Sequence, residues 1–128
     1  MEDAEAFRAA GRTLYTFGLV KEAEGNLSTF RDGTLRITRT GSRLAELADT
    51  DVVSGSLSGK LPGGSSDLAH HRRLYTTHGE GAVAHSHRPG SVPEGPPGEH
   101  GLYTFGTTLE EAVARMIDHV RGFSRPDA

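Results

Sequence analysis

The sequence predicts a single α/β domain in which a mixed β-sheet is covered by helices. Segments with helical periodicity alternate with short segments of strand-like alternation, and the Asp32-Gly33 pair is typical of a hairpin turn joining two strands. A length of 128 residues is that of one domain, residues 1–128, and no internal repeat is visible. The 17 glycines and the 34% hydrophobic content favour a small core with many tight turns over a helix bundle.

The expected elements follow from periodicity, turn residues and helix caps. In chain order they are a helix over residues 2–17, an extended segment over 25–30, a strand over 34–38, a short helix over 43–48, a strand over 51–53, a helix from 65–67 to about 77, a strand over 81–87, a strand over 102–105 and a final helix closing at 121–122. Ser42 is a candidate N-cap for the short helix, because a hydroxyl oxygen can accept a free N–H of the first turn. Thr107 with Glu110 and Thr108 with Glu111 offer two overlapping capping boxes for the final helix.

Charge and cysteine content exclude several classes of protein. The net charge of −3 and the dispersed Lys and Arg residues leave no basic surface for nucleic acid. No apolar run approaches the roughly 18 residues of a membrane span, and the acidic N-terminus lacks the pattern of a signal peptide. Without Cys there are no disulfides, thiol nucleophiles or thiolate zinc sites. We therefore expect a soluble cytoplasmic protein, and any metal must be held by His, Asp or Glu.

A pair of histidines ends the apolar run that begins at Ala82. His85 and His87 project from the same face of a strand because side chains alternate with period two. Two imidazoles on one face are a typical beginning of a divalent-metal site. The alternative is a pair of solvated histidines in a chain that has seven.

Two polar clusters suit the binding of an anion such as phosphate, and a third is better explained as a turn. That third cluster is residues 25–28 (Gly-Asn-Leu-Ser), which are typical of ordinary turn chemistry. In residues 38–42 (Thr-Arg-Thr-Gly-Ser), N–H and hydroxyl donors surround a glycine just before a helix, where helix capping explains them equally well. Ser65 and Ser66 add hydroxyl donors at a helix N-terminus.

Two further residues are candidates for acid/base chemistry or metal binding. Asp67 lies in the first turn of its helix, either as a dipole-matched cap or as a general base or metal ligand. His71 lies on the same helix face at i,i+4 spacing, within reach of a hydrogen bond to Asp67. His100 precedes the last strand and is a candidate third imidazole, although a lone His there is more often structural.

The order of these clusters resembles the class II aldolase/adducin family from about residue 5 to residue 122. The matching motifs, in order, are Gly25-Asn26-Leu27-Ser28, Ile37-Thr38-Arg39-Thr40-Gly41-Ser42, Ser65-Ser66-Asp67 with His71, His85-Ser86-His87, His100-Gly101 and Thr108-Leu109-Glu110-Glu111-Ala112. Each motif is weak alone, and their order and spacing make the resemblance fairly specific. It implies a three-layer α/β/α fold with a mixed, mostly antiparallel central sheet, in a homo-oligomer that is often a tetramer.

The resemblance also implies a set of site residues. The metal, usually zinc, would be held by His85, His87 and His100. The phosphate donors would be Asn26, Thr40, Gly41, Ser65 and Ser66. The acid/base position, a Glu in the family, is Asp67 here and is one methylene shorter.

Two further departures from the family pattern bear on activity. Only 12 residues, 88–99, separate the His pair from His100, and none is the Tyr that the family uses in catalysis. Arg39 stands where a Pro is common. The sequence thus predicts a metal-dependent aldolase, a carbon–carbon lyase, acting on a small phosphorylated sugar or related hydroxy-carbonyl compound. The alternatives are a degenerate, non-catalytic adducin-like binding or assembly module, and a metal-dependent epimerase or decarboxylase.

Overall fold

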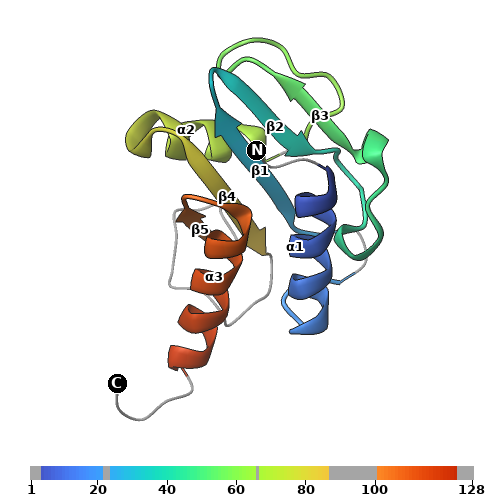
Figure 1. Ribbon diagram of the computed structural model, residues 1–128, viewed down its shortest axis with the longest axis vertical. Helices are drawn as coiled ribbons and strands as arrows, with labels where there is room; N and C mark the ends of the chain where they lie inside the picture. The colour runs from blue at the N-terminus through green and yellow to red at the C-terminus, as the bar shows by residue number, and fades with distance from the viewer. Residues whose placement is uncertain (1–3, 22–23, 66, 87–100, 124–128) are drawn as a thin grey trace.

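Five antiparallel strands form the central sheet of this computed structural model, which describes residues 4–21, 24–65, 67–86 and 101–123 (Figure 1). The strands are β1 (Asn26–Arg31), β2 (Thr34–Thr38), β3 (Val52–Gly55), β4 (Gly81–Ser86) and β5 (Leu102–Gly106). They lie in the order β3-β2-β1-β4-β5, and all four ladders that join them are antiparallel. Strands β1 and β4 are therefore neighbours at the middle of the sheet.

Helices cover both faces of the sheet. α1 (Ala4–Thr16) and α3 (Leu109–Phe123) lie on one face, and α2 (Leu68–His78) lies on the other (Figure 1). Two short 3₁₀ turns, η1 (Leu44–Glu46) and η2 (Asp49–Asp51), connect β2 to β3. This arrangement confirms the predicted α/β/α fold class. No helix in the described parts of the chain is long and apolar enough to cross a membrane.

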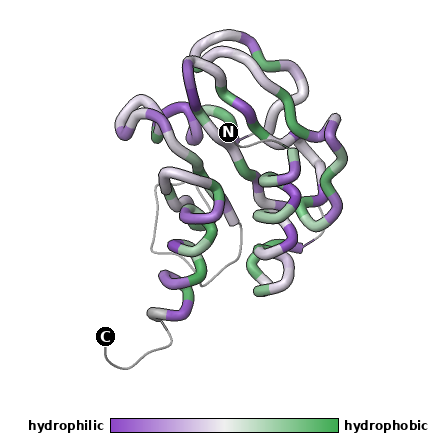
Figure 2. Tube along the Cα trace, viewed as in Figure 1, coloured by the Kyte–Doolittle hydropathy of each residue, from purple (hydrophilic) through white to green (hydrophobic). Residues whose placement is uncertain are grey.

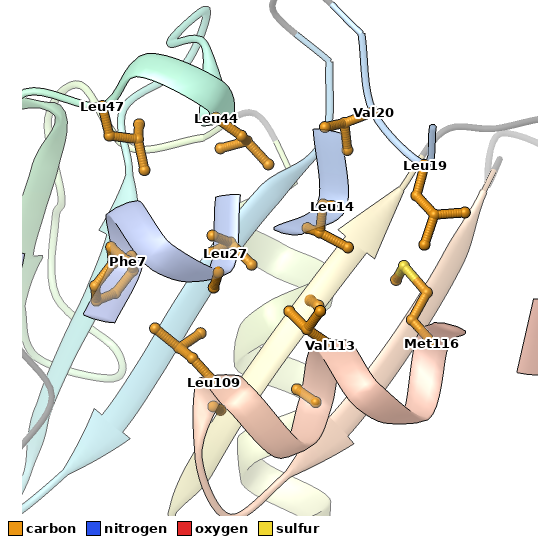
Figure 3. Close-up of a cluster of buried hydrophobic side chains, with 14 of the residues drawn as sticks. Phe7, Leu14, Leu19, Val20, Leu27, Leu44, Leu47, Leu109, Val113 and Met116 are labelled. Carbon is orange, nitrogen blue, oxygen red and sulfur yellow. The ribbon is translucent and has the colours of Figure 1, made fainter. Parts of the chain in front are cut away.

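Strand alternation divides the core into two clusters. Leu27, Ala82 and Ala84 face α1 and α3, where Figure 3 shows their neighbours gathered over the strands. Val83 faces the opposite way and packs with Tyr75 of α2. Hydrophobic and hydrophilic residues alternate along α1 and α3, as expected for helices that bury one side (Figure 2). Each large apolar side chain buried in this way contributes roughly 1.5–3 kcal/mol.

The hairpin turn between β1 and β2 has the predicted type I′ geometry. Asp32 and Gly33 both have positive φ, at 51° and 77°. This conformation is the one that Asp-Gly pairs tolerate, and its twist matches that of the flanking strands. The turn thereby fixes the register that pairs Arg31 with Thr34.

The short helix predicted over residues 43–48 is wrong in length and in its cap. Only the 3₁₀ turn η1 forms, and Arg43 occupies its N-cap without a side-chain hydrogen bond. The hydroxyl of Ser42 instead donates to the carbonyl oxygen of Arg39 at 2.6 Å. A serine hydroxyl bonds its own neighbouring backbone readily, and here that local bond competes with capping.

The final helix forms one half of the predicted capping box between Thr108 and Glu111. The Thr108 hydroxyl oxygen accepts the backbone N–H of Glu111 at 3.1 Å. The Glu111 carboxylate reaches one residue further than expected and accepts the backbone N–H of Thr107 at 2.6 Å and its hydroxyl at 2.9 Å. These bonds lower the pKa of Glu111 below its usual value.

Candidate active site

The candidate site lies at the end of the sheet where β1 begins and β4 ends. Asn26 and His85 are directly opposite each other in the β1–β4 ladder, so both side chains stand on the face covered by α2. Tyr103 is the partner of His85 on β5 and shares this face. Asp67 occupies the N-cap position of α2, above the same strands. The topology thus brings together polar residues from four separate elements.

His85 is fully buried and its ring orientation is fixed from two directions. The ring stacks on Tyr103 with centroids 3.8 Å apart and an interplanar angle of 15°. Its Nδ1 lies 3.1 Å from the carbonyl oxygen of Leu102, which can only accept, so Nδ1 carries a hydrogen. In the neutral ring the lone pair is therefore on Nε2. This tautomer can bind a metal through Nε2.

The carboxylate of Asp67 faces that nitrogen. Its Oδ2 lies 3.4 Å from His85 Nε2 and accepts a hydrogen bond from Asn26 Nδ2 at 2.9 Å. The Asp67 side chain is 16% exposed, and it makes no capping bond to α2. Ser65 takes part in the turn instead, as its hydroxyl oxygen accepts the Asp67 backbone N–H at 3.1 Å. Asp67 thus stands at the N-cap, where its charge matches the helix dipole, without a side-chain capping hydrogen bond.

The His71 ring bonds other side chains than that of Asp67, in contrast to the simplest interpretation of the i,i+4 spacing, and the two residues share only the backbone bond from His71 N–H to the Asp67 carbonyl oxygen at 3.3 Å. The Nε2 of His71 bonds the Oδ1 of Asn26, and Asn26 donates to Asp67 through its Nδ2. The Nδ1 of His71 lies 2.6 Å from the hydroxyl of Ser28, which in turn lies 2.7 Å from the hydroxyl of Tyr75. Asn26 thus stands between the two residues that the helical spacing pairs.

Burial strongly disfavours a charge on His71. The side chain is fully buried, and this burial, together with the nearby His85, lowers the pKa of His71 to about 3 despite the opposing effect of Asp67. The imidazole is therefore neutral at physiological pH, with one nitrogen a donor and the other an acceptor.

Three of the predicted phosphate donors, Thr40, Gly41 and Ser65, lie in two loops that are joined at this end of the sheet. The backbone N–H of Thr40 donates to the carbonyl oxygen of Gly63 at 3.0 Å, and Arg39 forms an isolated bridge with Gly64. This pairing holds the Thr40-Gly41 turn beside the loop that leads to Ser65. Thr40 and Gly41 are exposed, whereas Ser65 is buried. The guanidinium of Arg39 donates to the carbonyl oxygen of Thr50 at 3.0 and 3.2 Å.

Three predicted site residues, Ser66, His87 and His100, lie outside the described residues. Within the described ranges, no group of three or more His, Asp or Glu side chains is placed to hold a metal. The donor set of His85 and Asp67 nevertheless fits a divalent cation. A neutral Nε2 lone pair opposite a carboxylate is favourable when a positive charge lies between them, either a proton or a shared metal ion.

Gly101 supports the ring of His85 from the start of the last strand. Its φ is 99°, and a Cβ built there would lie 1.9 Å from the Ser86 carbonyl oxygen and 2.9 Å from His85 Cε1. No other residue type allows the backbone to approach so closely in this conformation. The glycine of the His100-Gly101 motif therefore has a packing role that the sequence alone did not indicate.

An apolar hollow of about 620 Å³ lies elsewhere, between α1 and α3. Its lining is dominated by alanines, Leu109, Val113 and Ile117, and it is on the opposite face of the sheet from Asp67. The polar residues of its lining are Thr13, Thr108 and Glu110. The carboxylate of Glu110 would repel a phosphorylated substrate. We therefore place the candidate site at Asp67 and His85.

The model of the class II aldolase and adducin N-terminal domain family matches residues 5–93. This chain belongs to that family. The match includes Asn26, Asp67 and His85, so the polar cluster described above lies within the family domain. Membership of the family supports an aldolase-like or lyase function.

Solved structures of the same fold are similar over nearly the whole chain. L-fuculose-1-phosphate aldolase from Thermus thermophilus is 22% identical, with a TM-score of 0.80 over 91% of this chain and 88% of that one. YgbL from Escherichia coli, a putative aldolase/epimerase/decarboxylase, is 21% identical, with a TM-score of 0.75 over 91% and 84%. At this level of identity the likeness establishes the fold.

A curated relative is more similar in sequence over a shorter range. It is a probable bifunctional methylthioribose-1-phosphate isomerase/methylthioribulose-1-phosphate dehydratase from Nocardia farcinica (strain IFM 10152). The two are 33% identical over a 94-residue alignment, and the match covers 69% of this chain and 17% of the relative. The chain thus spans about a sixth of the length of that protein.

Three side chains of the site were not among the predicted site residues: Ser28, although its motif was singled out, Tyr75 and Tyr103. The signals were present in the spacing. Ser28 shares the strand face of Asn26 by alternation, and Tyr75 follows His71 at i,i+4. Tyr103 could be found only through the β4–β5 register, which depends on how the chain returns to the sheet.

Proposed function

We propose that this chain is a metal-dependent lyase domain, an aldolase that cleaves a small phosphorylated ketose. The observation that carries the proposal is the Asp67 carboxylate, held by Asn26 at 2.9 Å and placed 3.4 Å from Nε2 of the buried His85. A fixed, largely buried carboxylate beside a metal-binding imidazole suits proton transfer next to a carbonyl group.

His85, His87 and His100 would hold the metal, in keeping with the divalent-metal dependence that is general among class II aldolases; we propose zinc. When bound, the ion supplies a Lewis acid for the carbonyl and the adjacent hydroxyl of the substrate. The Leu102 carbonyl supports this assignment, because its bond to Nδ1 leaves Nε2 of His85 as the coordinating atom.

Asp67 would move the proton. Its Oδ2 accepts the hydrogen of the substrate hydroxyl as the carbon–carbon bond breaks, and a protonated Asp67 returns a hydrogen to the carbon that has gained the electron pair. Asn26 orients Oδ2 for both transfers. Asn26 Nδ2 keeps a second N–H beyond its bond to Asp67, consistent with a further bond to substrate.

The phosphate would bind at the paired loops. Thr40, Gly41, Ser65 and Ser66 supply hydroxyl and backbone N–H donors, and the bond from Thr40 to Gly63 brings the two loops together. Anchoring the far end of the substrate in this way aligns the reacting carbons with Asp67. We further propose a homo-oligomer, tetrameric as is frequent in the family.

The test compares wild type with Asp67→Ala in an aldolase assay over a panel of ketose phosphates, with the metal content measured on the same samples. Asp118→Ala, which removes a carboxylate from α3 on the opposite face of the sheet, is the matched control. We expect stoichiometric zinc or a similar ion in wild type, and a fall in kcat of at least about 100-fold in Asp67→Ala alone. Unchanged turnover in Asp67→Ala would remove the proton-transfer role.

Methylthioribulose-1-phosphate belongs in the panel because the curated relative is named for its dehydration. Loss of water from this substrate, without cleavage of a carbon–carbon bond, would replace the aldolase proposal with a dehydratase. Absence of bound metal and of turnover, in a stable oligomer that survives His85→Gln, would instead support the non-catalytic assembly module.

A further inference from the structure

Four buried side chains form a hydrogen-bonded chain behind Asp67. Tyr75, Ser28, His71 and Asn26, which we call the polar chain, are connected in that order, and Asn26 bonds the Asp67 carboxylate. Three of them are at most 1% exposed and Asn26 is 4% exposed. They come from two elements, β1 and α2, so the chain crosses from the sheet to the helix that covers it.

We propose that His71 is a positioning residue that acts through Asn26 to fix the orientation of the Asp67 carboxylate. This inference rests on the proposed function, in which Asp67 Oδ2 moves the proton. It assigns to His71 and the polar chain a role beyond filling the space between α2 and the sheet.

The hydrogen bonds of the polar chain can run in only one direction. The Asp67 carboxylate accepts only, so the group of Asn26 that faces it is the Nδ2 donor. This places Asn26 Oδ1 toward His71, whose Nε2 must then carry the hydrogen.

The same logic continues to the far end of the polar chain. A neutral His71 that donates through Nε2 accepts through Nδ1, so the Ser28 hydroxyl donates to it. Ser28 has a single hydrogen, so the Tyr75 hydroxyl must donate to Ser28. Every donor therefore points toward the Asp67 carboxylate, and each bond polarises the next in the same sense.

Satisfaction of the buried polar groups would by itself produce the same direction, because the carboxylate accepts only. The positioning role rests instead on Asn26, which contacts the Asp67 carboxylate through Nδ2 and His71 through Oδ1. A free Asn26 amide could rotate and offer either end to Asp67. His71 holds Oδ1 and thereby keeps an N–H on the carboxylate.

The first test separates kcat from KM in the metal-loaded protein. His71→Leu removes the donor to Asn26, while His71→Gln retains an amide N–H near the Nε2 position. His78→Leu, at the exposed C-terminal end of the same helix, is the matched control. We expect His71→Leu to lower kcat by roughly 10- to 100-fold with KM nearly unchanged, because displacing a catalytic carboxylate by about 1 Å lowers the rate by up to that factor. We expect His71→Gln to recover most of the lost kcat. Equal kcat in folded His71→Leu and wild type would overturn the inference.

The second test needs no activity and no metal. In ¹⁵N-histidine-labelled wild type, we expect NMR to identify His71 as the tautomer with the hydrogen on Nε2. In Asp67→Ala the Nε2–H proton signal should move upfield, because Asn26 no longer donates to a charged acceptor. A hydrogen on Nδ1, or a signal unaffected by Asp67→Ala, would overturn the inference.

The two tests separate this inference from the proposed function. Inactivity of wild type on every ketose phosphate would reject the lyase proposal and, with it, the catalytic consequence of the polar chain. The NMR result still decides whether His71 and Asp67 are coupled in the order that the hydrogen bonds require.

Discussion

Acidification should destabilise the folded protein through His71. In the unfolded chain a histidine has a pKa near 6.5, while burial lowers the pKa of His71 in the folded protein to about 3. Because the unfolded state then binds a proton that the folded state excludes, the stabilisation is fully present above pH 6.5 and is lost as the pH falls from 6.5 toward 3. The interval from pH 7 to pH 5 includes about 1.5 pH units below the unfolded-state pKa. The free energy of unfolding therefore falls by about 2 kcal/mol over this interval.

The assay is urea unfolding of metal-free protein at pH 7, 6 and 5, for wild type and His71→Gln. Other groups also titrate in this range, so the informative quantity is the difference between the two pH slopes. The variant should start less stable at pH 7 and lose about 2 kcal/mol less on going to pH 5, since Gln does not titrate. Parallel slopes, or a His71 ring that titrates near 6.5 in NMR spectra of the folded protein, would refute the reasoning.

Three further predictions test the supports of the site and of the last helix. Gly101→Ala should lower the free energy of unfolding by about 3 kcal/mol or more, since the added Cβ would lie 1.9 Å from the Ser86 carbonyl oxygen at a positive φ. A thermal melt close to that of wild type would contradict the packing assigned to Gly101. Thr108→Ala should cost about 1 kcal/mol by removing the cap on the Glu111 N–H, measured by chemical denaturation, and no change would show that the cap contributes nothing. Added zinc should raise the melting temperature of wild type and leave His85→Gln unchanged, whereas equal shifts would place the ion elsewhere.

The fold was predictable because its signals are local. The Asp32-Gly33 pair sets a type I′ turn by itself, and the apolar positions of α1 and α3 repeat at the helical period. The error at residues 43–48 arose where two local preferences compete, since the Ser42 hydroxyl can cap a helix or bond a nearby carbonyl. Which bond forms depends on the 3₁₀ turn that packs Leu44 under α1, and this is a tertiary effect.

The candidate site was predictable only in part, because its geometry depends on strand register. The sequence placed Asp67 and His85 near a common substrate, and the structure brings these two side chains within 3.4 Å. The sequence did not place Asn26 between Asp67 and His71, because that position requires β1 to pair with β4 and α2 to lie over their junction. Helical spacing describes neighbours on one helix and carries no information about a side chain that enters from a strand.

The short side chain of Asp67 is best understood from its position at the start of α2. By resemblance to the family, a Glu was expected here, and the Asp67 side chain is one methylene shorter. Its carboxylate lies within hydrogen-bond distance of Asn26 and 3.4 Å from His85 Nε2. Asn26 and His85 are paired across two central strands, so neither can move outward without breaking the ladder. A longer side chain at this position would have to fold back to meet the same two atoms, whereas Asp67 meets them directly with fewer rotatable bonds to order.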